Sequence, residues 1–156
     1  MHPSNNIRKA TLLDYPILKE IGMECYDKTV AQNEKSWLSR LLFKRYFSKR
    51  KFLEREKNNV EIYCLLEEDK VVGFYELESQ GGLASLYVSV NYHKKGYGKA
   101  LMLHALNKAK ELKLREVYLD SSYYARDFYK HLGFKEVKPP RIVLGVFMVA
   151  MKIKID

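Results

Sequence analysis

Three segments rich in β-branched and aromatic residues follow one another between residues 60 and 90. They cover residues 60–67, 71–78 and 83–90, and only the turns Glu68-Asp69-Lys70 and Gln80-Gly81-Gly82 separate them. Turns of this length cannot hold a helical crossover, so consecutive strands must run antiparallel. The chain therefore contains an antiparallel meander, and its fold must be built around it.

The rest of the chain mixes helical and strand patterns. Asp14 with Pro16 predicts a helix start, because Asp can cap free N–H groups and Pro is tolerated in the first turn. Further helices are predicted over residues 35–57, 97–113 and 124–132, and further strands at 7–11, 115–120, 134–137 and 143–153. The apolar stripe of the helix at 35–57 is predicted to contain Trp37, Leu38, Leu41, Leu42, Tyr46 and Phe47.

These elements predict a mixed α/β (α+β) fold, with about four helices against a mostly antiparallel central sheet. With 156 residues, of which 47% are hydrophobic and 30% charged, the chain is expected to form one domain over residues 1–156. It shows neither a signal-peptide pattern nor an apolar run long enough to span a bilayer, so a cytoplasmic protein is expected. Cys25 and Cys64 are expected to be free thiols, and the histidines lack metal-ligand spacing, so no metal is expected.

The charge is strongly positive, at +9 from 28 basic and 19 acidic residues. Residues 35–57 alone contain nine basic and two acidic residues. Such a stretch can bind nucleic acid, an acidic membrane surface or an anionic ligand, but it is more often a solvated helix face. We expect neither a specific nucleic-acid partner nor a membrane partner.

The strongest functional signal is a predicted strand that runs into a glycine loop and then a helix, over residues 86–100 (LYVSVNYHKKGYGKA). The first N–H groups of a helix are unpaired and carry partial positive charge. Gly96 and Gly98 let the backbone approach an anion closely, and Lys94, Lys95 and Lys99 add full charges. The segment is typical of a pyrophosphate cradle.

A second segment follows, with the pattern Ser122-x-x-Ala125-x-x-Phe128-Tyr129-x-x-x-Gly133-Phe134. Together the two segments closely resemble the GNAT superfamily of N-acetyltransferases, whose patterns are Q/R-x-x-G-x-G/A and N-x-x-A-x-x-F/L-Y-x-x-x-G-F. The resemblance covers almost the whole chain. His93 stands where the family has Gln or Arg, and Ser122 where it has Asn; both side chains can still form hydrogen bonds.

The resemblance implies acetyl transfer from acetyl-CoA to an amine, on a fold with a splayed central strand pair. The splayed strand would pair its free backbone groups with the pantetheine arm of the cofactor. Cofactor contacts are thereby expected at Leu86, Tyr87, Val88, His93, Lys94, Lys95, Gly96, Tyr97, Gly98, Lys99, Ser122, Phe128 and Tyr129.

Catalysis of this reaction by direct attack needs an acid and a base. The resemblance points to Tyr129 as the acid that protonates the departing thiolate. Glu76 and Glu78 lie at i and i+2 on the second meander strand and share a face that is otherwise apolar, so either could be the base. Glu76 is preferred because it lies deeper in the strand, and the N–H of Val88 is a candidate donor to the oxyanion.

The acceptor is less constrained. In the family the first helices and last strands shape its pocket, and this region holds many cations and the aromatic residues Tyr26, Trp37, Phe43, Tyr46 and Phe47. A small primary amine with an acidic or aromatic group would suit it. The alternatives are a protein or peptide amine as acceptor, or a non-catalytic module that binds CoA or nucleic acid. The protein could be a monomer or a homodimer.

Overall fold

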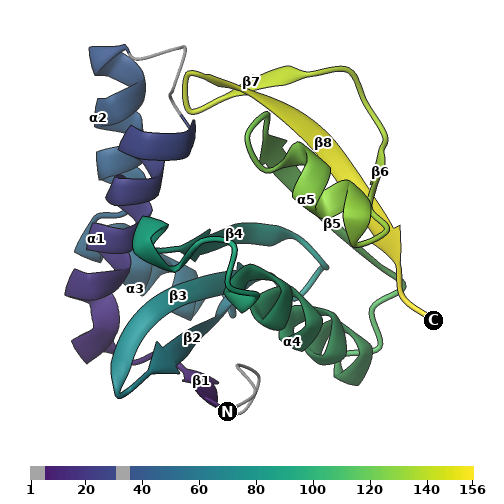
Figure 1. The fold of residues 1–156 in the computed structure, drawn as a ribbon, viewed down its shortest axis with the longest axis horizontal. Helices are drawn as coiled ribbons and strands as arrows, with labels where there is room; N and C mark the ends of the chain where they lie inside the picture. Colours follow the sequence, from purple (N-terminus) through teal and green to yellow (C-terminus); the bar gives the residue numbers. More distant parts are fainter. Residues whose placement is uncertain (1–5, 31–35) are drawn as a thin grey trace.

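The computed structural model describes residues 6–30 and 36–156. Within them the strands form two four-stranded sheets with antiparallel pairing (Figure 1). The first sheet has the order β1-β2-β3-β4, and its last three strands are the predicted meander, which is confirmed. Its strands are β1 (Ile7–Lys9), β2 (Glu61–Glu67), β3 (Lys70–Leu77) and β4 (Leu83–Val88).

The second sheet is built around the C-terminal strand β8 (Val146–Lys154), which pairs with β5 (Glu116–Ser122), β6 (Lys135–Glu136) and β7 (Arg141–Val143). The single strand predicted over residues 143–153 is wrong at its start, because a hairpin joins β7 to β8 there. Leu144 and Gly145 form its turn with φ of 51° and 79°. Two left-handed residues match the twist of a tight hairpin, which the sequence Leu-Gly does not announce.

Five α-helices lie in the described ranges, namely α1 (Tyr15–Cys25), α2 (Trp37–Tyr46), α3 (Lys49–Lys57), α4 (Tyr97–Glu111) and α5 (Arg126–His131). Helix α1 begins after Asp14 as predicted, but the Asp14 carboxylate does not cap it. It binds the Arg8 guanidinium at 2.8 Å and accepts from the Thr11 N–H at 2.8 Å. This pairing ties β1 to the start of α1 and lowers the pKa of Asp14 to about 2.

The single helix predicted over residues 35–57 is two helices, and Lys35 lies outside the described residues. The first ends at Tyr46, and Ser48 caps the second, since its Oγ accepts from the Lys51 N–H at 3.3 Å.

The predicted apolar stripe of this segment is wrong in its first part, because Trp37 is 78% exposed and Leu41 52%, whereas Phe47 is buried as predicted. Ser39 and Phe43, which the predicted stripe left out, are buried and lie eight and four residues before Phe47. Ser39 can be buried because its hydroxyl bonds to that of Tyr26, so a polar residue occupies the inner face.

The helices cover the sheets in two groups, each over its own apolar core (Figure 1). Helix α4 lies against β3 and β4 and buries Leu101, Met102 and Ala105. On the other side, α1, α2 and α3 cover the first sheet over a core that contains Phe43, Phe47, Phe52 and Phe74. None of the helices in the described ranges has the length and hydropathy to cross a bilayer.

In the part of the chain that the structure describes, backbone pairing joins the two sheets only near the starts of β4 and β5. A single parallel bridge joins Gly82 to Tyr118, and the Tyr118 N–H donates to the Gly81 carbonyl at 3.0 Å. Beyond this bridge β4 and β5 separate (Figure 1). The expected splayed strand pair is therefore present, and it leaves one edge of β4 without a strand partner among the described residues.

Candidate active site

Two cavities lie where β4 and β5 diverge. The first, of about 580 Å³, is bordered by α1, the loop before α4, and α5. The second, of about 610 Å³, is bordered by α2 and β7. Five residues line both cavities, namely Leu83, Tyr87, Leu119, Asp120 and Met148. The cavities therefore meet between β4, β5 and β8.

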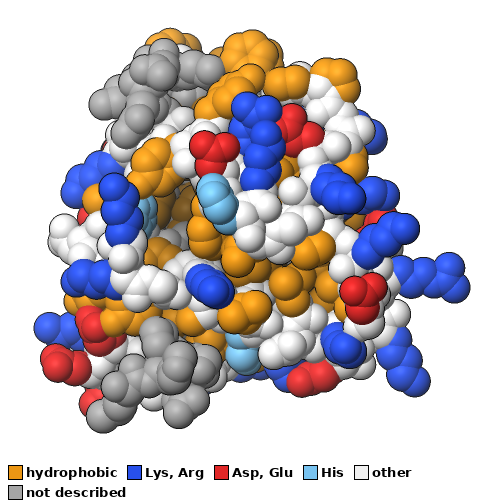
Figure 2. Space-filling view, turned by 45° about the vertical axis from the view of Figure 1, so that its right-hand side comes forward, with side chains coloured by type: hydrophobic (Ala, Val, Ile, Leu, Met, Phe, Trp, Pro, Cys, Tyr) orange, Lys and Arg blue, Asp and Glu red, His pale blue; other side chains and the backbone are white. Residues whose placement is uncertain are grey.

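The first cavity gathers all of the predicted cofactor-contacting residues except Lys95 and Tyr97. Those two side chains have other partners. The Lys95 ammonium lies 5.1 Å from the centre of the Tyr92 ring, and the Tyr97 hydroxyl donates to the Glu67 carboxylate. Figure 2 shows a hollow with hydrophobic side chains inside and Lys and Arg side chains around it.

The glycine loop has the conformation that its composition suggests. Gly96 is left-handed, with φ of 85°, and a Cβ at this position would meet no atom within 4 Å. Gly98 packs closely, since a Cβ there would lie 3.3 Å from Phe128. No side chain of the described residues caps the start of α4 at Gly96, so its first N–H groups are available to an anion in the cavity.

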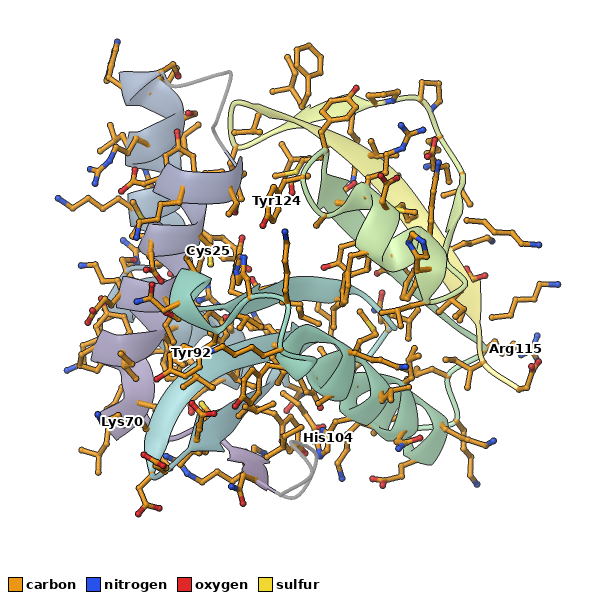
Figure 3. The ribbon with its side chains drawn as sticks, in the orientation of Figure 1. Cys25, Lys70, Tyr92, His104, Arg115 and Tyr124 are labelled. Carbon is orange, nitrogen blue, oxygen red and sulfur yellow. The ribbon has the colours of Figure 1, made fainter. Side chains whose placement is uncertain are left out.

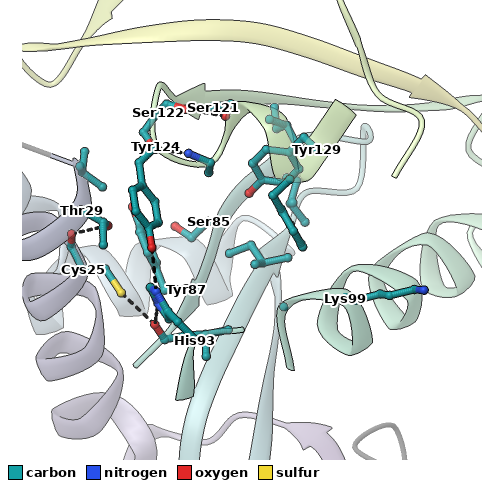
Figure 4. Close-up of a pocket in the computed structure, with 18 of the residues that line it drawn as sticks. Cys25, Thr29, Ser85, Tyr87, His93, Lys99, Ser121, Ser122, Tyr124 and Tyr129 are labelled. Atoms are coloured by element: carbon teal, nitrogen blue, oxygen red, sulfur yellow. Dashed lines mark hydrogen bonds between the residues drawn. The ribbon is translucent and has the colours of Figure 1, made fainter. Parts of the chain in front are cut away.

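The Val88 carbonyl, at the end of β4, already has two donors from this chain. It accepts from the Cys25 thiol at 3.1 Å and bonds to His93 Nε2 at 2.7 Å (Figure 4). The other ring nitrogen of His93 bonds to the Tyr124 hydroxyl at 3.1 Å. Since Cys25 and Tyr124 come from facing sides of the split (Figure 3), these bonds tie the two sides together across the cavity.

Tyr129 lies on α5 with its ring in the core and its hydroxyl toward the first cavity (Figure 4). Its ring packs against Phe128 and Phe134, with centroids 5.1 and 5.6 Å away. Burial raises the pKa of its phenol, so the group stays protonated and can donate. Ser122 lines the same wall, and its Oγ accepts from the Ala125 N–H at 3.3 Å just before α5.

Glu76 is 1% exposed and lines neither cavity. Its carboxylate pairs with Arg55 at 3.1 Å and accepts from the Tyr46 hydroxyl at 2.9 Å and the Ser85 hydroxyl at 3.2 Å. Burial raises its pKa, although Arg55 acts in the opposite direction. Because Ser85 lines the first cavity and Tyr46 the second, these hydroxyls connect Glu76 to both.

Glu78 lies in a different environment, because it follows the end of β3, next to a register shift in the pairing of β3 with β4 at Glu76 and Leu77. Its carboxylate lies over Gly82, where an added Cβ would be 2.6 Å from Oε2, and it lines the second cavity. Glu76 is thus enclosed by side-chain partners whereas Glu78 borders a cavity, a difference that their spacing in the sequence does not reveal.

The aromatic residues predicted for the acceptor pocket lie in three different environments. Phe43 and Tyr46 line the second cavity, Tyr26 and Phe47 are buried in the core, and Trp37 is exposed. Sequence reasoning missed Asp120, which lies at the junction and pairs with Arg141. No local pattern links two residues that far apart in the chain.

Comparison with known proteins identifies this arrangement. The family model of the GNAT acetyltransferase domain matches residues 27–155. This chain belongs to the GNAT acetyltransferase family. It is therefore an acetyltransferase, and both the fold and the enzyme class expected from its motifs are confirmed. No curated protein matches the sequence.

Solved GNAT structures superpose over nearly the whole chain. A GCN5-related N-acetyltransferase of Rhodopseudomonas palustris has a TM-score of 0.83 at 16% identity, covering 95% of this chain and 94% of its own. PaiA N-acetyltransferase of Thermoplasma acidophilum, in complex with coenzyme A, has 0.80 at 25% identity, with 95% and 97% covered. YncA, a Salmonella typhimurium acetyltransferase with its cofactor acetyl-CoA, has 0.71 at 18% identity, with 96% and 93% covered.

Proposed function

We propose that residues 1–156 form a single N-acetyltransferase domain that transfers the acetyl group of acetyl-CoA to the primary amine of a small molecule. The observation that carries this proposal is the junction of two cavities at the splayed strands, with the glycine loop on one side. Cys25 and Cys64 are both free and buried, which suits action in the reducing cytoplasm.

The first cavity suits the cofactor. The loop from His93 to Lys99 offers backbone N–H groups and lysines to the diphosphate, and the free edge of β4 offers peptide groups to the pantetheine arm. His93 holds the Val88 carbonyl at this edge, so the pantetheine would pair with other peptide groups of Leu86–Val88 or displace the His93 side chain.

The second cavity suits the acceptor, because it reaches the same junction from the side of α2 and β7. Acetyl-CoA supplies an acetyl thioester, whose carbonyl carbon the amine can attack directly. Tyr129 then donates its hydroxyl proton to the thiolate sulfur as the C–S bond breaks. We assign the base role to Glu76, with Ser85 accepting the amine proton and passing its own proton to the carboxylate.

Acetyl-CoA is expected to raise the melting temperature of the protein, because a ligand that binds only the native state adds to its stability. Gly96→Asp is expected to abolish this shift, since it places a negative charge beside the diphosphate. Gly96→Asn is the matched control, because it has the same shape without the charge and Cβ has open space. A shift that Gly96→Asp leaves intact would disprove the role of the loop, and no shift at all would disprove the cofactor.

The basic segment at residues 35–57 is not expected to bind nucleic acid specifically. Three of its arginines are paired, Arg40 with Asp27, Arg50 with Glu54 and Arg55 with Glu76. Fluorescence anisotropy with duplex DNA should show weak association that disappears at about 150 mM salt. Sequence-specific binding that survives this salt would add a nucleic-acid function to the enzyme.

A further inference from the structure

The charged side chains of the second cavity balance one another. Three carboxylates and three cationic groups line it, namely Glu78, Glu116, Asp120, Lys138, Arg141 and Lys152. Two of the carboxylates are paired, Glu116 with Lys152 at 3.0 Å and Asp120 with Arg141. A lining with both signs in equal number favours a ligand that itself carries both signs.

The pair formed by Asp120 and Arg141 is placed to meet such a ligand. Arg141 Nε lies 3.1 Å from one oxygen of the carboxylate and a terminal nitrogen lies 2.5 Å from the other. Asp120 lines both cavities, so it borders the junction where an amine would meet the thioester. Arg141 lines only the second cavity and is 58% exposed, which leaves donors of its guanidinium free for a ligand.

We propose that the acceptor is a small zwitterion of the amino-acid type, with its ammonium group held by Asp120 and its carboxylate by Arg141. The proposal rests on the proposed acetyl transfer and names the substrate class of that same site. It assigns Asp120 to positioning of the reacting amine and Arg141 to selection of the acceptor, while the proton leaves through the group that serves as base.

The net charge of the other small amines makes them poorer ligands for this pair than a zwitterion. A diamine would bring two positive charges to the Asp120 carboxylate, whose charge Arg141 already neutralises. An acceptor with net negative charge would be repelled by Asp120. A zwitterion can instead exchange partners with the pair, so that each of the four charged groups keeps an opposite charge as neighbour. The electrostatic balance of the cavity is then the same with and without the ligand.

The rest of the lining indicates the side chain of the acceptor. Phe43, Leu83, Tyr87 and Met148 contribute apolar or aromatic surface to the second cavity. Apolar surface in a ligand site favours apolar groups of similar size. Amino acids with a large apolar or aromatic side chain are therefore the acceptors of choice.

The test compares acceptors that differ in charge alone, by release of the CoA thiol. L-phenylalanine should exceed L-phenylalaninamide and phenethylamine in kcat/KM by about 10- to 100-fold, the value of one charged hydrogen-bonded contact, and 1,4-diaminobutane should be poorest. Phenylalaninamide has the less basic amine, so more of it is deprotonated at neutral pH. Its intrinsic reactivity therefore favours it, and a preference for the acid must come from the protein.

Variants of the charged residues test which of them causes the preference for phenylalanine over its amide. Arg141→Gln should reduce the ratio of kcat/KM between phenylalanine and its amide to about 1, whereas Asp120→Asn should lower kcat/KM for both. Arg50→Gln is the matched control, because Arg50 also pairs with a carboxylate, that of Glu54, but lies on α3 away from both cavities. It should leave the ratio unchanged.

Two results would overturn the proposal. One is equal or better activity with the amide, the diamine or a peptide amine, and the other is no transfer to any amino acid by protein that binds acetyl-CoA. In the first case acetyl transfer stands and only the substrate class fails. If acetyl-CoA itself neither binds nor is turned over, the proposed function fails before the acceptor is in question.

Discussion

Tyr129→Phe is expected to lower kcat by about 10²- to 10⁴-fold, the range for loss of one general acid. The substitution removes one hydroxyl and keeps the ring, whose contacts with Phe128 and Phe134 bury it in the core. Since the proton is needed in the transition state and not in the bound complex, KM should change little. A thiolate with a pKa of about 8.5 can depart slowly without help, so the loss should be partial.

The control for this measurement is Tyr123→Phe, because Tyr123 is 54% exposed and lines neither cavity. It should keep full kcat, and both variants should show the acetyl-CoA thermal shift of the wild type. Full kcat in Tyr129→Phe on the true acceptor would mean that another group protonates the sulfur or that the thiolate leaves unassisted. A loss that falls only on KM would assign Tyr129 to binding.

Local sequence patterns predict most of the helices and strands of the fold. The meander over residues 60–90 follows from tight turns between β-rich runs, and α4 follows from its glycine start and apolar periodicity. The same reasoning failed at residues 35–57, where the inner face contains Ser39. A hydroxyl on the buried face cannot be anticipated without its partner, Tyr26, which lies in a different element.

The candidate site also has one part that local patterns predict and one part that depends on contacts between distant residues. The loop from His93 to Lys99 and the segment around Tyr129 are contiguous motifs, so the sequence alone located the first cavity. The second cavity depends on contacts between distant parts of the chain. Asp120 gains its significance from Arg141 and Glu76 from Arg55, and neither pairing has a sequence signature.

Arg55→Met is expected to lower the free energy of unfolding by about 3–5 kcal/mol near pH 7.5, measured by urea denaturation. Arg55 is the ion-pair partner of Glu76 among the described residues, and the Glu76 side chain is 1% exposed. Its removal leaves the buried carboxylate with the hydroxyls of Tyr46 and Ser85 as its remaining partners within residues 6–30 and 36–156. The control Arg50→Met breaks an exposed pair with Glu54 and should cost less than about 1 kcal/mol.

The pH dependence of this loss tests its cause. Burial raises the pKa of Glu76, and without Arg55 it should rise further, because Arg55 acts to lower it. The folded variant then keeps a proton that the unfolded chain, with a glutamate pKa of about 4.3, has already lost. Stability of the variant should therefore fall as the pH rises through the window above about 4.3, and its deficit relative to wild type should shrink at pH 5.

The double variant Arg55→Met/Glu76→Gln separates a structural role of Glu76 from a catalytic one. Glutamine keeps an oxygen that accepts from Tyr46 and Ser85 but carries no charge, so the double variant should be more stable than Arg55→Met alone. If Glu76 is the base, the double variant should still lack activity, and Glu76→Gln alone should lose the acidic limb of the pH–rate profile.

A stable double variant with normal turnover would make Glu76 structural only and leave the amine proton to another group. A deficit equal at pH 5 and pH 8, with no rescue by Glu76→Gln, would mean that lost packing of the Arg55 side chain, and not a buried charge, destabilises the protein.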